Sequence, residues 1–251
     1  MMSGIDIKDV FFRYNNSGFA LEKISLFIKK GTFLGITGIN GSGKSTFSYL
    51  LNGLIPNTLK GTMTGKVTVD GITTDKKSVA FFAKQVGMVF QNPDFSLFNL
   101  TVSEEVSFGL KNLKFDSIAQ RVIDALSSVG LAGYAKRDPQ TLSVGEKQKV
   151  CLAGVLAMDT DYIVLDEPTA QLDYKNSKEL YELLTGLNKR GKTIIVIEHD
   201  TDLLWNYTKE TLILNKGEIV SSGPTSKILS NTKMLNLLGI KVPNYKNNHT
   251  V

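Results

Sequence analysis

Short runs that are apolar, or that alternate between apolar and polar residues, dominate the first third of the chain. They fall at residues 5–10, 24–28, 33–37, 65–69 and 86–90, and each has the length and period of a β-strand. Pairs of turn-forming residues, Lys30-Gly31 and Asp70-Gly71 among them, separate these runs. The pattern therefore predicts a strand-rich unit at the front of the chain.

Beyond that unit the hydrophobic period changes to that of helices. Thr101-Val102-Ser103-Glu104 matches the capping box that begins many helices, and apolar residues follow it at helical spacing. A second helical pattern covers residues 116–129 and stops at Gly130. A leucine stripe over residues 180–187 predicts a further helix that ends near Gly191.

Two continuous apolar runs, at residues 162–165 and 193–197, predict strands that are buried on both faces. Another predicted strand, at residues 33–37, is followed by a helical pattern at 47–54. Strands that alternate with helices predict an α/β fold built on a parallel core sheet. The helical patterns between the strands predict a helical insertion at about residues 95–160.

Composition narrows the class of protein. The chain has 251 residues, 42% of them hydrophobic, so a single cassette with subdomains is expected. The net charge of +5 comes from scattered basic residues, which does not indicate nucleic-acid binding. The only cysteine, Cys151, excludes an intramolecular disulfide and is expected to be a small buried residue. No apolar run approaches the roughly 20 residues that span a bilayer, so a reducing cytosol is expected and any membrane-spanning part would belong to another chain.

Residues 38–46 carry the most specific chemical signal, a glycine-rich loop between a predicted strand and a predicted helix. Glycine permits positive φ, so the backbone N–H groups of such a loop can point at a polyphosphate on a helix N-terminus. The glycines are Gly38, Gly41 and Gly43. Lys44 would add a charge for the outer phosphates, Ser45 an oxygen ligand for Mg²⁺, and Thr46 a hydrogen bond to a phosphate oxygen. The alternative is a glycine-rich turn with an incidental lysine.

The strand predicted at residues 162–165 ends in two adjacent carboxylates, Asp166 and Glu167. On an extended backbone they would point to opposite sides and could take separate roles. We expect Asp166 to hold Mg²⁺ through water and Glu167 to polarise the water that attacks the γ-phosphate. By itself this pair would be interpreted as a solvent-facing strand end, and the phosphate loop favours the catalytic role.

Residues 142–148, Leu-Ser-Val-Gly-Glu-Lys-Gln, open another predicted helix. Ser143 is suited to capping that helix, and Gly145 leaves a backbone N–H exposed, which makes an anion site without a lysine of its own. Alone the signal is weak, because Ser-x-Gly at a helix start is common and usually only a cap.

Four further residues complete an ordered series. They are Tyr14 in Phe12-Arg13-Tyr14, Gln91 in Val89-Phe90-Gln91-Asn92-Pro93, Asp173 in Pro168-Thr169-Ala170-Gln171-Leu172-Asp173, and His199 in Ile197-Glu198-His199-Asp200. Together with the phosphate loop, the acid pair and residues 142–148, they resemble the seven ordered motifs of ABC-type ATPases, the nucleotide-binding subunits of ABC transporters. The resemblance covers about residues 5–220.

This resemblance implies a P-loop ATPase cassette at residues 1–225, with a RecA-like parallel-sheet core and an N-terminal antiparallel β subdomain. Residues 226–251 would form a short C-terminal extension, and the polar stretch from Asn244 is expected to be loose. The implied mechanism has two cassettes sandwiching two ATP molecules. Each ATP would lie between the phosphate loop of one cassette and the signature helix of the other.

The same resemblance implies roles for single residues. ATP-binding residues would be Tyr14, which stacks on adenine, and Gly38, Asn40, Gly41, Ser42, Gly43, Lys44, Ser45 and Thr46. The catalytic residues would be Lys44, Gln91, Glu167 and His199, and the Mg²⁺ ligands would be Ser45, Gln91 and Asp166. The signature residues that act in trans would be Ser143, Gly145 and Glu146. The D-loop residue would be Asp173. The alternatives are a strand aromatic for Tyr14, a surface polar residue for Gln91 and a structural histidine for His199.

Several local strings resemble the ATPase of energy-coupling-factor importers, which take up vitamins or transition-metal ions. They are residues 51–56, 91–94, 106–110 and 153–158. This likeness implies a peripheral protein on the cytoplasmic face of the membrane. Its partners would be a transmembrane coupling subunit, a substrate-binding membrane subunit and a second ATPase. Phe95-Ser96 departs from the usual Asn-Gln, which bears on the contact with the membrane partner.

Val144 replaces the first glycine of the family signature, and its β-branch narrows the conformations available beside a phosphate. We therefore expect a heterodimer in which only one composite site carries the valine, with a homodimer as the alternative. Two other functions remain open: an ABC ATPase of translation or repair, which usually has two cassettes or a long coiled coil, and a partner that binds nucleotide but barely hydrolyses it. The sequence does not name the transported solute.

Overall fold

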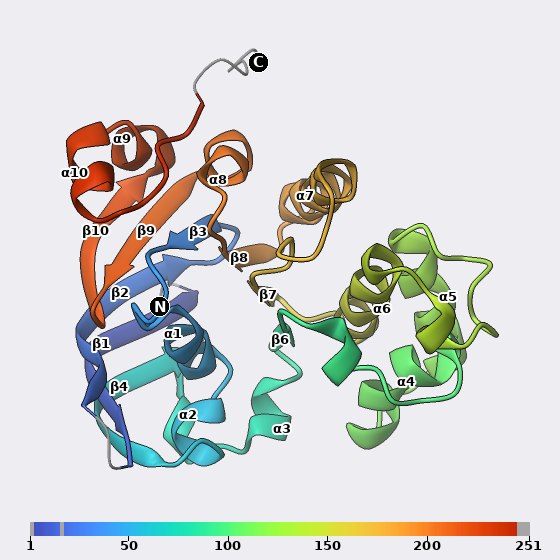
Figure 1. The fold of residues 1–251 in the computed structure, drawn as a ribbon. Coiled ribbons are helices and arrows are strands. Elements are labelled where there is room, and N and C mark those ends of the chain that lie inside the picture. The colour runs from blue at the N-terminus through green and yellow to red at the C-terminus, as the bar shows by residue number, and fades with distance from the viewer. Residues whose placement is uncertain (1–2, 16–17, 245–251) are drawn as a thin grey trace.

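The computed structural model describes residues 3–15 and 18–244. The strands of its central sheet are β3 (Phe33–Thr37), β6 (Val86–Val89), β7 (Tyr162–Asp166), β8 (Thr193–Ile197), β9 (Glu210–Asn215) and β10 (Glu218–Pro224). They are ordered β10-β9-β3-β8-β7-β6, and every neighbouring pair is parallel except β9 and β10 (Figure 1). The predicted parallel core sheet is therefore confirmed.

The core strands β3, β7 and β8 are buried along their whole length, which agrees with their unbroken apolar sequences. Parallel strands end at the same edge of a sheet, so Thr37, Asp166 and Ile197 finish close to one another. β6 ends at Val89, one residue earlier than predicted, and Gln91 follows it. The segments that carry most of the predicted chemistry thus leave the sheet at one edge.

A second sheet, which is antiparallel, is formed by strands from the first third of the chain. It contains β1 (Gly4–Tyr14), β2 (Phe19–Lys29), β4 (Gly61–Val69) and β5 (Ile72–Thr73), in the order β2-β1-β4-β5. Helix α1 (Lys44–Leu51) contacts strands of both sheets, and Phe47 is fully buried in the cluster that joins them. α1 begins at Lys44, earlier than its apolar pattern, because polar residues form its first turn. The sheets are also tied by the Tyr162 hydroxyl, which donates to Asp70 over 2.7 Å.

Three helices, α4 (Val102–Asn112), α5 (Ile118–Ser128) and α6 (Val144–Ala157), pack on one another beside the β6 edge of the core sheet (Figure 1). We call them the helical group. The predicted capping box at Thr101 and Glu104 is present, since each side chain accepts from the backbone N–H of the other. This agrees with the predicted helical insertion.

The remaining helices complete the molecule. They are α2 (Leu54–Asn57), α3 (Val79–Phe82), α7 (Tyr174–Lys189), α8 (Thr201–Tyr207), α9 (Thr225–Leu229) and α10 (Thr232–Leu237), with 3₁₀ turns at Thr74–Lys76, Pro93–Phe95 and Pro139–Thr141. α7 buries Leu180, Leu184 and Leu187 of the predicted leucine stripe and partly buries Leu183, and it stops before Gly191, whose φ is +91°. Within the described ranges no helix combines the length and hydropathy needed to cross a bilayer. The domain boundary at residue 225 stays a prediction, and the predicted loose tail falls on residues 245–251, outside the described part.

Candidate functional site

The glycine-rich loop between β3 and α1 has the backbone that its sequence predicts. Gly38 and Gly43 have φ of +155° and +100°, and a Cβ at either would lie within 2.6 Å of a backbone carbonyl oxygen. A side chain is therefore excluded at both positions. Gly43 also occupies the N-cap of α1, so the helix N-terminus opens onto the loop.

Lys44 lies inside this loop. Its ammonium group donates to the carbonyl oxygens of Gly38 and Ile39, over 3.0 and 3.1 Å. Burial lowers the pKa of Lys44, and the nearby carboxylates of Glu167 and Asp166 partly oppose that shift. The loop therefore holds a buried cation that faces two acidic groups, a position from which it can bind an incoming anion.

Asp166 is the last residue of β7 and is buried, with 5% of its surface exposed. Burial raises its pKa, and a hydrogen bond with Ser45 and the charge of Lys44 act in the opposite direction. Its Oδ1 atom is buried without a protein hydrogen-bond partner. A buried carboxylate oxygen with a free lone pair beside a serine hydroxyl fits a hard cation such as Mg²⁺.

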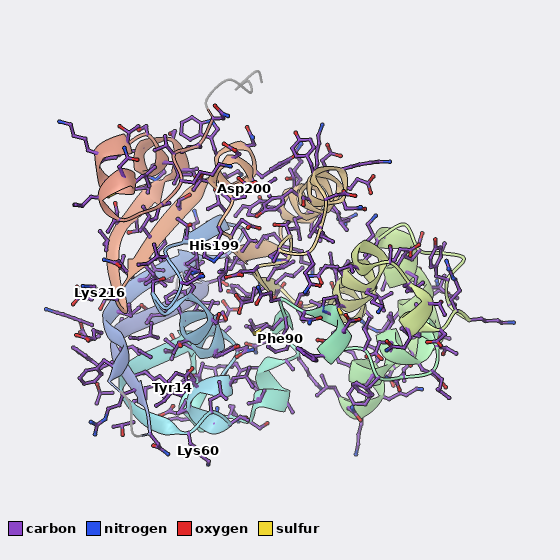
Figure 2. All side chains as sticks on the ribbon, viewed as in Figure 1. Tyr14, Lys60, Phe90, His199, Asp200 and Lys216 are labelled. Atoms are coloured by element: carbon purple, nitrogen blue, oxygen red, sulfur yellow. The ribbon has the colours of Figure 1, made fainter. Side chains whose placement is uncertain are left out.

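The sequence pattern predicted that Glu167 continues the extended strand. In the structure it does not. Its φ is +47°, in the left-handed region, while its N–H still donates to the carbonyl of Ile197 at the end of β8 over 3.0 Å. Glu167 Oε1 lies 2.8 Å from His199 Nε2, and Oε2 accepts from Gln91 Nε2 over 2.8 Å. The two carboxylates are separated by this left-handed turn and not by strand alternation. Figure 2 marks His199 and Asp200 in the segment after β8.

An open cavity of about 460 Å³ collects most of the predicted nucleotide residues. Its lining is Ala20, Asn40, Gly41, Gly43, Lys44, Ser45, Thr46, Gln91 and Glu167. Tyr14 lies beside it, with its hydroxyl 3.1 Å from the Thr46 hydroxyl and its ring edge-on to Phe12. The signature residues at 143–146 do not line this cavity. Ala20 is the one lining residue that sequence reasoning missed, because alanine carries no chemical signal.

The signature residues form a second capping box at the start of α6. The Ser143 N–H donates to Glu146 Oε2 over 2.8 Å, and the Tyr134 hydroxyl donates to Glu146 Oε1 over 2.8 Å. These hydrogen bonds lower the pKa of Glu146, with the Ser143 backbone making the largest contribution. Glu146 thus shapes the end of its own helix.

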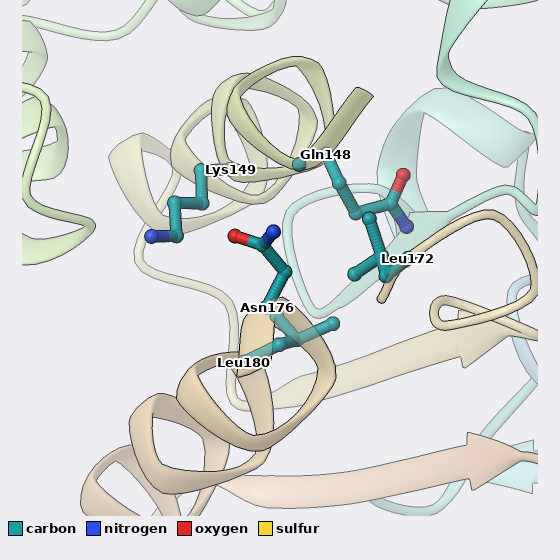
Figure 3. A pocket seen from close by; sticks show the side chains of 6 residues that line it. Gln148, Lys149, Leu172, Asn176 and Leu180 are labelled. Carbon is teal, nitrogen blue, oxygen red and sulfur yellow. The ribbon is translucent and has the colours of Figure 1, made fainter. Parts of the chain in front are cut away.

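Gly145 of α6 lies close to Asn176 of α7, the residue that Asp173 binds as the cap of that helix. A Cβ at Gly145 would lie 3.2 Å from the Asn176 side-chain oxygen, so the glycine allows close packing, and the residue predicted to expose its N–H is buried here. Figure 3 shows Asn176 of α7 directed toward α6, near Gln148 and Lys149. Asp173 caps α7 by accepting from the Asn176 N–H over 2.8 Å. An aspartate just ahead of a helical pattern is a sequence signal for such a cap.

Two other features were missed because their partners are distant in sequence. The Lys147 ammonium of α6 lies 2.6 Å from the Asp94 carboxylate in the turn after Gln91, which joins the helical group to that turn. Glu198, which precedes His199, is a buried carboxylate with several hydrogen-bond donors around it.

Cys151 was predicted to be a small buried residue. In the structure it is partly buried in a cavity wall, and burial raises the pKa of its thiol to about 12.

Comparison with known proteins gives a consistent family. The family model described as "ABC transporter" matches residues 21–170. A putative ABC transporter ATP-binding protein of Pyrococcus horikoshii is 46% identical over 246 residues, covering 96% of this chain and 87% of that protein. The energy-coupling factor transporter ATP-binding protein EcfA of Methanocaldococcus jannaschii is 38% identical, covering 95% and 85%.

A solved structure has the same architecture. The cbiO1 protein of Clostridium perfringens, part of the ABC transporter complex cbiONQ, superposes with a TM-score of 0.83. It shares 32% sequence identity, and the match covers 94% of this chain and 96% of that one.

Proposed function

The chain belongs to the ABC transporter family and is an ATP-binding ATPase of that family, and on this premise we propose that it powers an importer of the energy-coupling-factor type. The likeness to EcfA and to cbiO1 over almost the whole chain supports this class. The chain would sit on the cytoplasmic face of the membrane and take ATP as its substrate. The solute would be bound by a membrane subunit.

The observation that carries the proposal is the placement of Glu167 between two partners at the cavity wall. His199 holds one carboxylate oxygen and Gln91 the other, each at 2.8 Å. A carboxylate fixed in this way can accept a proton from a water that attacks the γ-phosphate. Phosphoryl transfer needs little covalent chemistry from the protein, so this positioning and the charge of Lys44 supply most of the catalysis.

Three residues of the site also fit an Mg²⁺ ion that would bind together with the nucleotide. Ser45 and Asp166 would hold the ion, with Gln91 as a further ligand, and the ion would neutralise phosphate charge. Among the residues that the structure describes, no group of three or more His, Cys, Asp or Glu side chains could hold a metal. Phosphate oxygens of ATP and waters would complete the coordination of the ion.

The open cavity supports a second cassette as a partner. It has no signature residue in its lining, and we expect the N-terminus of α6 to meet the phosphates bound by another copy. Ser143 and Gly145 would then act in trans. Because Val144 alters this helix end, we favour a related second ATPase over an identical one.

An exposed aromatic surface supports a membrane partner. Phe95, Phe98, Leu100 and Phe108 have 89, 63, 82 and 43% of their surface exposed, and the rings of Phe98 and Phe108 pack edge to face at 4.8 Å. Large exposed apolar patches commonly mark interaction sites. The Lys147–Asp94 ion pair connects the turn that carries Phe95 to the signature helix. A membrane subunit seated here would be linked mechanically to the nucleotide site.

Purification of the tagged chain from native membranes tests this function. We expect it to bring down two membrane proteins and a second ATPase, and Phe95→Asp with Phe98→Asp to release the membrane proteins. The matched control is Phe19→Asp, since Phe19 is also exposed but lies in β2, outside the aromatic surface. Recovery of the chain with ribosomes or repair proteins in place of membrane proteins would contradict the proposal.

A further inference from the structure

Glu198 is a buried carboxylate that does not line the nucleotide cavity. It follows β8 and has 4% of its surface exposed. Burying a carboxylate is costly unless hydrogen bonds compensate, and an apolar residue would fill the same space more cheaply. The presence of an acid here therefore calls for an explanation in terms of what it binds.

Each carboxylate oxygen of Glu198 has its own partners. Oε1 accepts from the backbone N–H of His199 over 2.8 Å and from that of Asp200 over 3.2 Å. Oε2 accepts from the Thr169 hydroxyl over 2.5 Å, and the Tyr181 hydroxyl of α7 lies 3.5 Å away. Burial raises the pKa of Glu198, and the hydrogen bonds from Thr169, Asp200 and His199 oppose that shift. One side chain thus satisfies donors from three separate segments.

These segments meet at the reacting end of the site. Thr169 lies two residues after Glu167, in the turn that leads from β7 to α7. His199 presents the ring that contacts Glu167. The Glu198 backbone is itself fixed to the sheet, because its N–H donates to the Ile36 carbonyl of β3 over 2.9 Å. The carboxylate therefore ties the turn after Glu167 to the segment that carries His199, and both to a rigid strand.

We propose that Glu198 is a positioning residue that holds His199 against Glu167 by fixing the His199 backbone to the Thr169 turn. The inference rests on the proposed function, in which Glu167 and His199 act on the γ-phosphate. Glu198 does not touch the nucleotide cavity, so its removal should lower kcat and leave KM for ATP nearly unchanged. A small displacement of a positioned catalytic group is enough to cost about tenfold or more in rate.

The chain offers a direct reporter for this geometry, because His199 and His249 are its only histidines. In a His249→Gln background the imidazole C–H signals in an NMR spectrum come from His199 alone. Glu167→Ala, which removes the carboxylate beside the ring, gives the reference spectrum for a released His199. We expect Glu198→Ala and Thr169→Val to move the His199 signals toward that reference. Glu198→Gln should restore them, because its amide oxygen can still accept from both backbone N–H groups and its NH₂ can donate to Thr169.

The matched control is Thr211→Val, which removes another buried hydroxyl, in β9, that is hydrogen-bonded to Thr225 over 2.9 Å. It should destabilise the chain to a similar degree without moving the His199 signals. Unchanged His199 signals in folded Glu198→Ala and Thr169→Val, or an equal movement in Thr211→Val, would overturn the proposal. If Glu167→Gln retained full turnover while the His199 signals behaved as expected, the proposed function would fail and the positioning role would stand.

Discussion

Lys44 links sequence to function at the scale of a residue. Within residues 3–15 and 18–244, its ammonium donates only to loop carbonyls, and it faces two carboxylates. ATP phosphates would be stronger partners than these carbonyls. Lys44→Ala should weaken ATP binding about tenfold or more, since a hydrogen bond to a charged group contributes about 1.5–3 kcal/mol. Equilibrium titration with ATP measures this. Lys149→Ala, which removes a lysine paired with Glu179 outside the cavity, should bind ATP as the wild type does.

At the scale of elements, two capping boxes with the same design allow a clean comparison. Thr101 begins α4 and Ser143 begins α6, each with a glutamate three residues later. Thr101→Ala and Ser143→Ala should each lower the free energy of unfolding by about 1 kcal/mol. Only Ser143→Ala should also lower ATP turnover in the assembled complex, because only Ser143 is proposed to meet a nucleotide. Equal losses of turnover in the two variants would show that Ser143 acts only as a helix cap.

The contact between the two sheets has a pH dependence that can be measured. Burial alone would raise the pKa of Asp70, but hydrogen bonds from Ser3, Tyr162 and Gly4 outweigh it and hold the pKa below its usual range. A lowered folded-state pKa means that the ionised carboxylate stabilises the fold above the unfolded value of about 3.9. This stabilisation is lost as the pH falls through the folded-state pKa.

Asp70→Asn should therefore lower the melting temperature at pH 7, and its difference from the wild type should shrink progressively below about pH 4. Thermal unfolding followed at several pH values gives both curves. Asp75→Asn, at an exposed position nearby, should show little effect at any pH. A difference between Asp70→Asn and the wild type that stayed constant down to acidic pH would contradict the assigned role of the carboxylate.

Most of the architecture could be predicted from the sequence, because buried strands, capping boxes and the glycine loop are local signals. The turn at Glu167 could not, since a positive φ at a glutamate has no local sequence signal, and the side-chain partners Gln91 and His199 are distant in sequence. The burial of Glu198 was missed for a related reason. A charged residue at a strand end is normally predicted to be exposed, and here the contact with Thr169 and the packing on the sheet bury it. Local patterns gave the elements, whereas tertiary contacts decide which polar groups act together.

At the scale of the whole molecule, Val144 predicts an asymmetric complex. The chain has its own phosphate loop, Glu167 and His199. The helix end that it presents to a partner, however, carries a β-branched residue, Val144. Val144→Gly should raise hydrolysis at the partner's nucleotide and leave the site built on Lys44 nearly unchanged. The test is to disable one phosphate-loop lysine at a time in the assembled complex and to measure ATP turnover. Equal effects on both sites, or a native complex with only this ATPase chain, would contradict the asymmetry.

The catalytic role of Glu167 is tested most directly by ATP turnover of Glu167→Gln in the assembled complex, with the second ATPase silenced at its own phosphate-loop lysine. The amide keeps the shape of the carboxylate but loses its ability to accept a proton from water. We predict unchanged ATP binding and a turnover lower by about a hundredfold, equivalent to about 2.7 kcal/mol of transition-state stabilisation. Turnover near the wild-type rate, with ATP bound, would contradict the assignment of Glu167 as the general base of this ATPase.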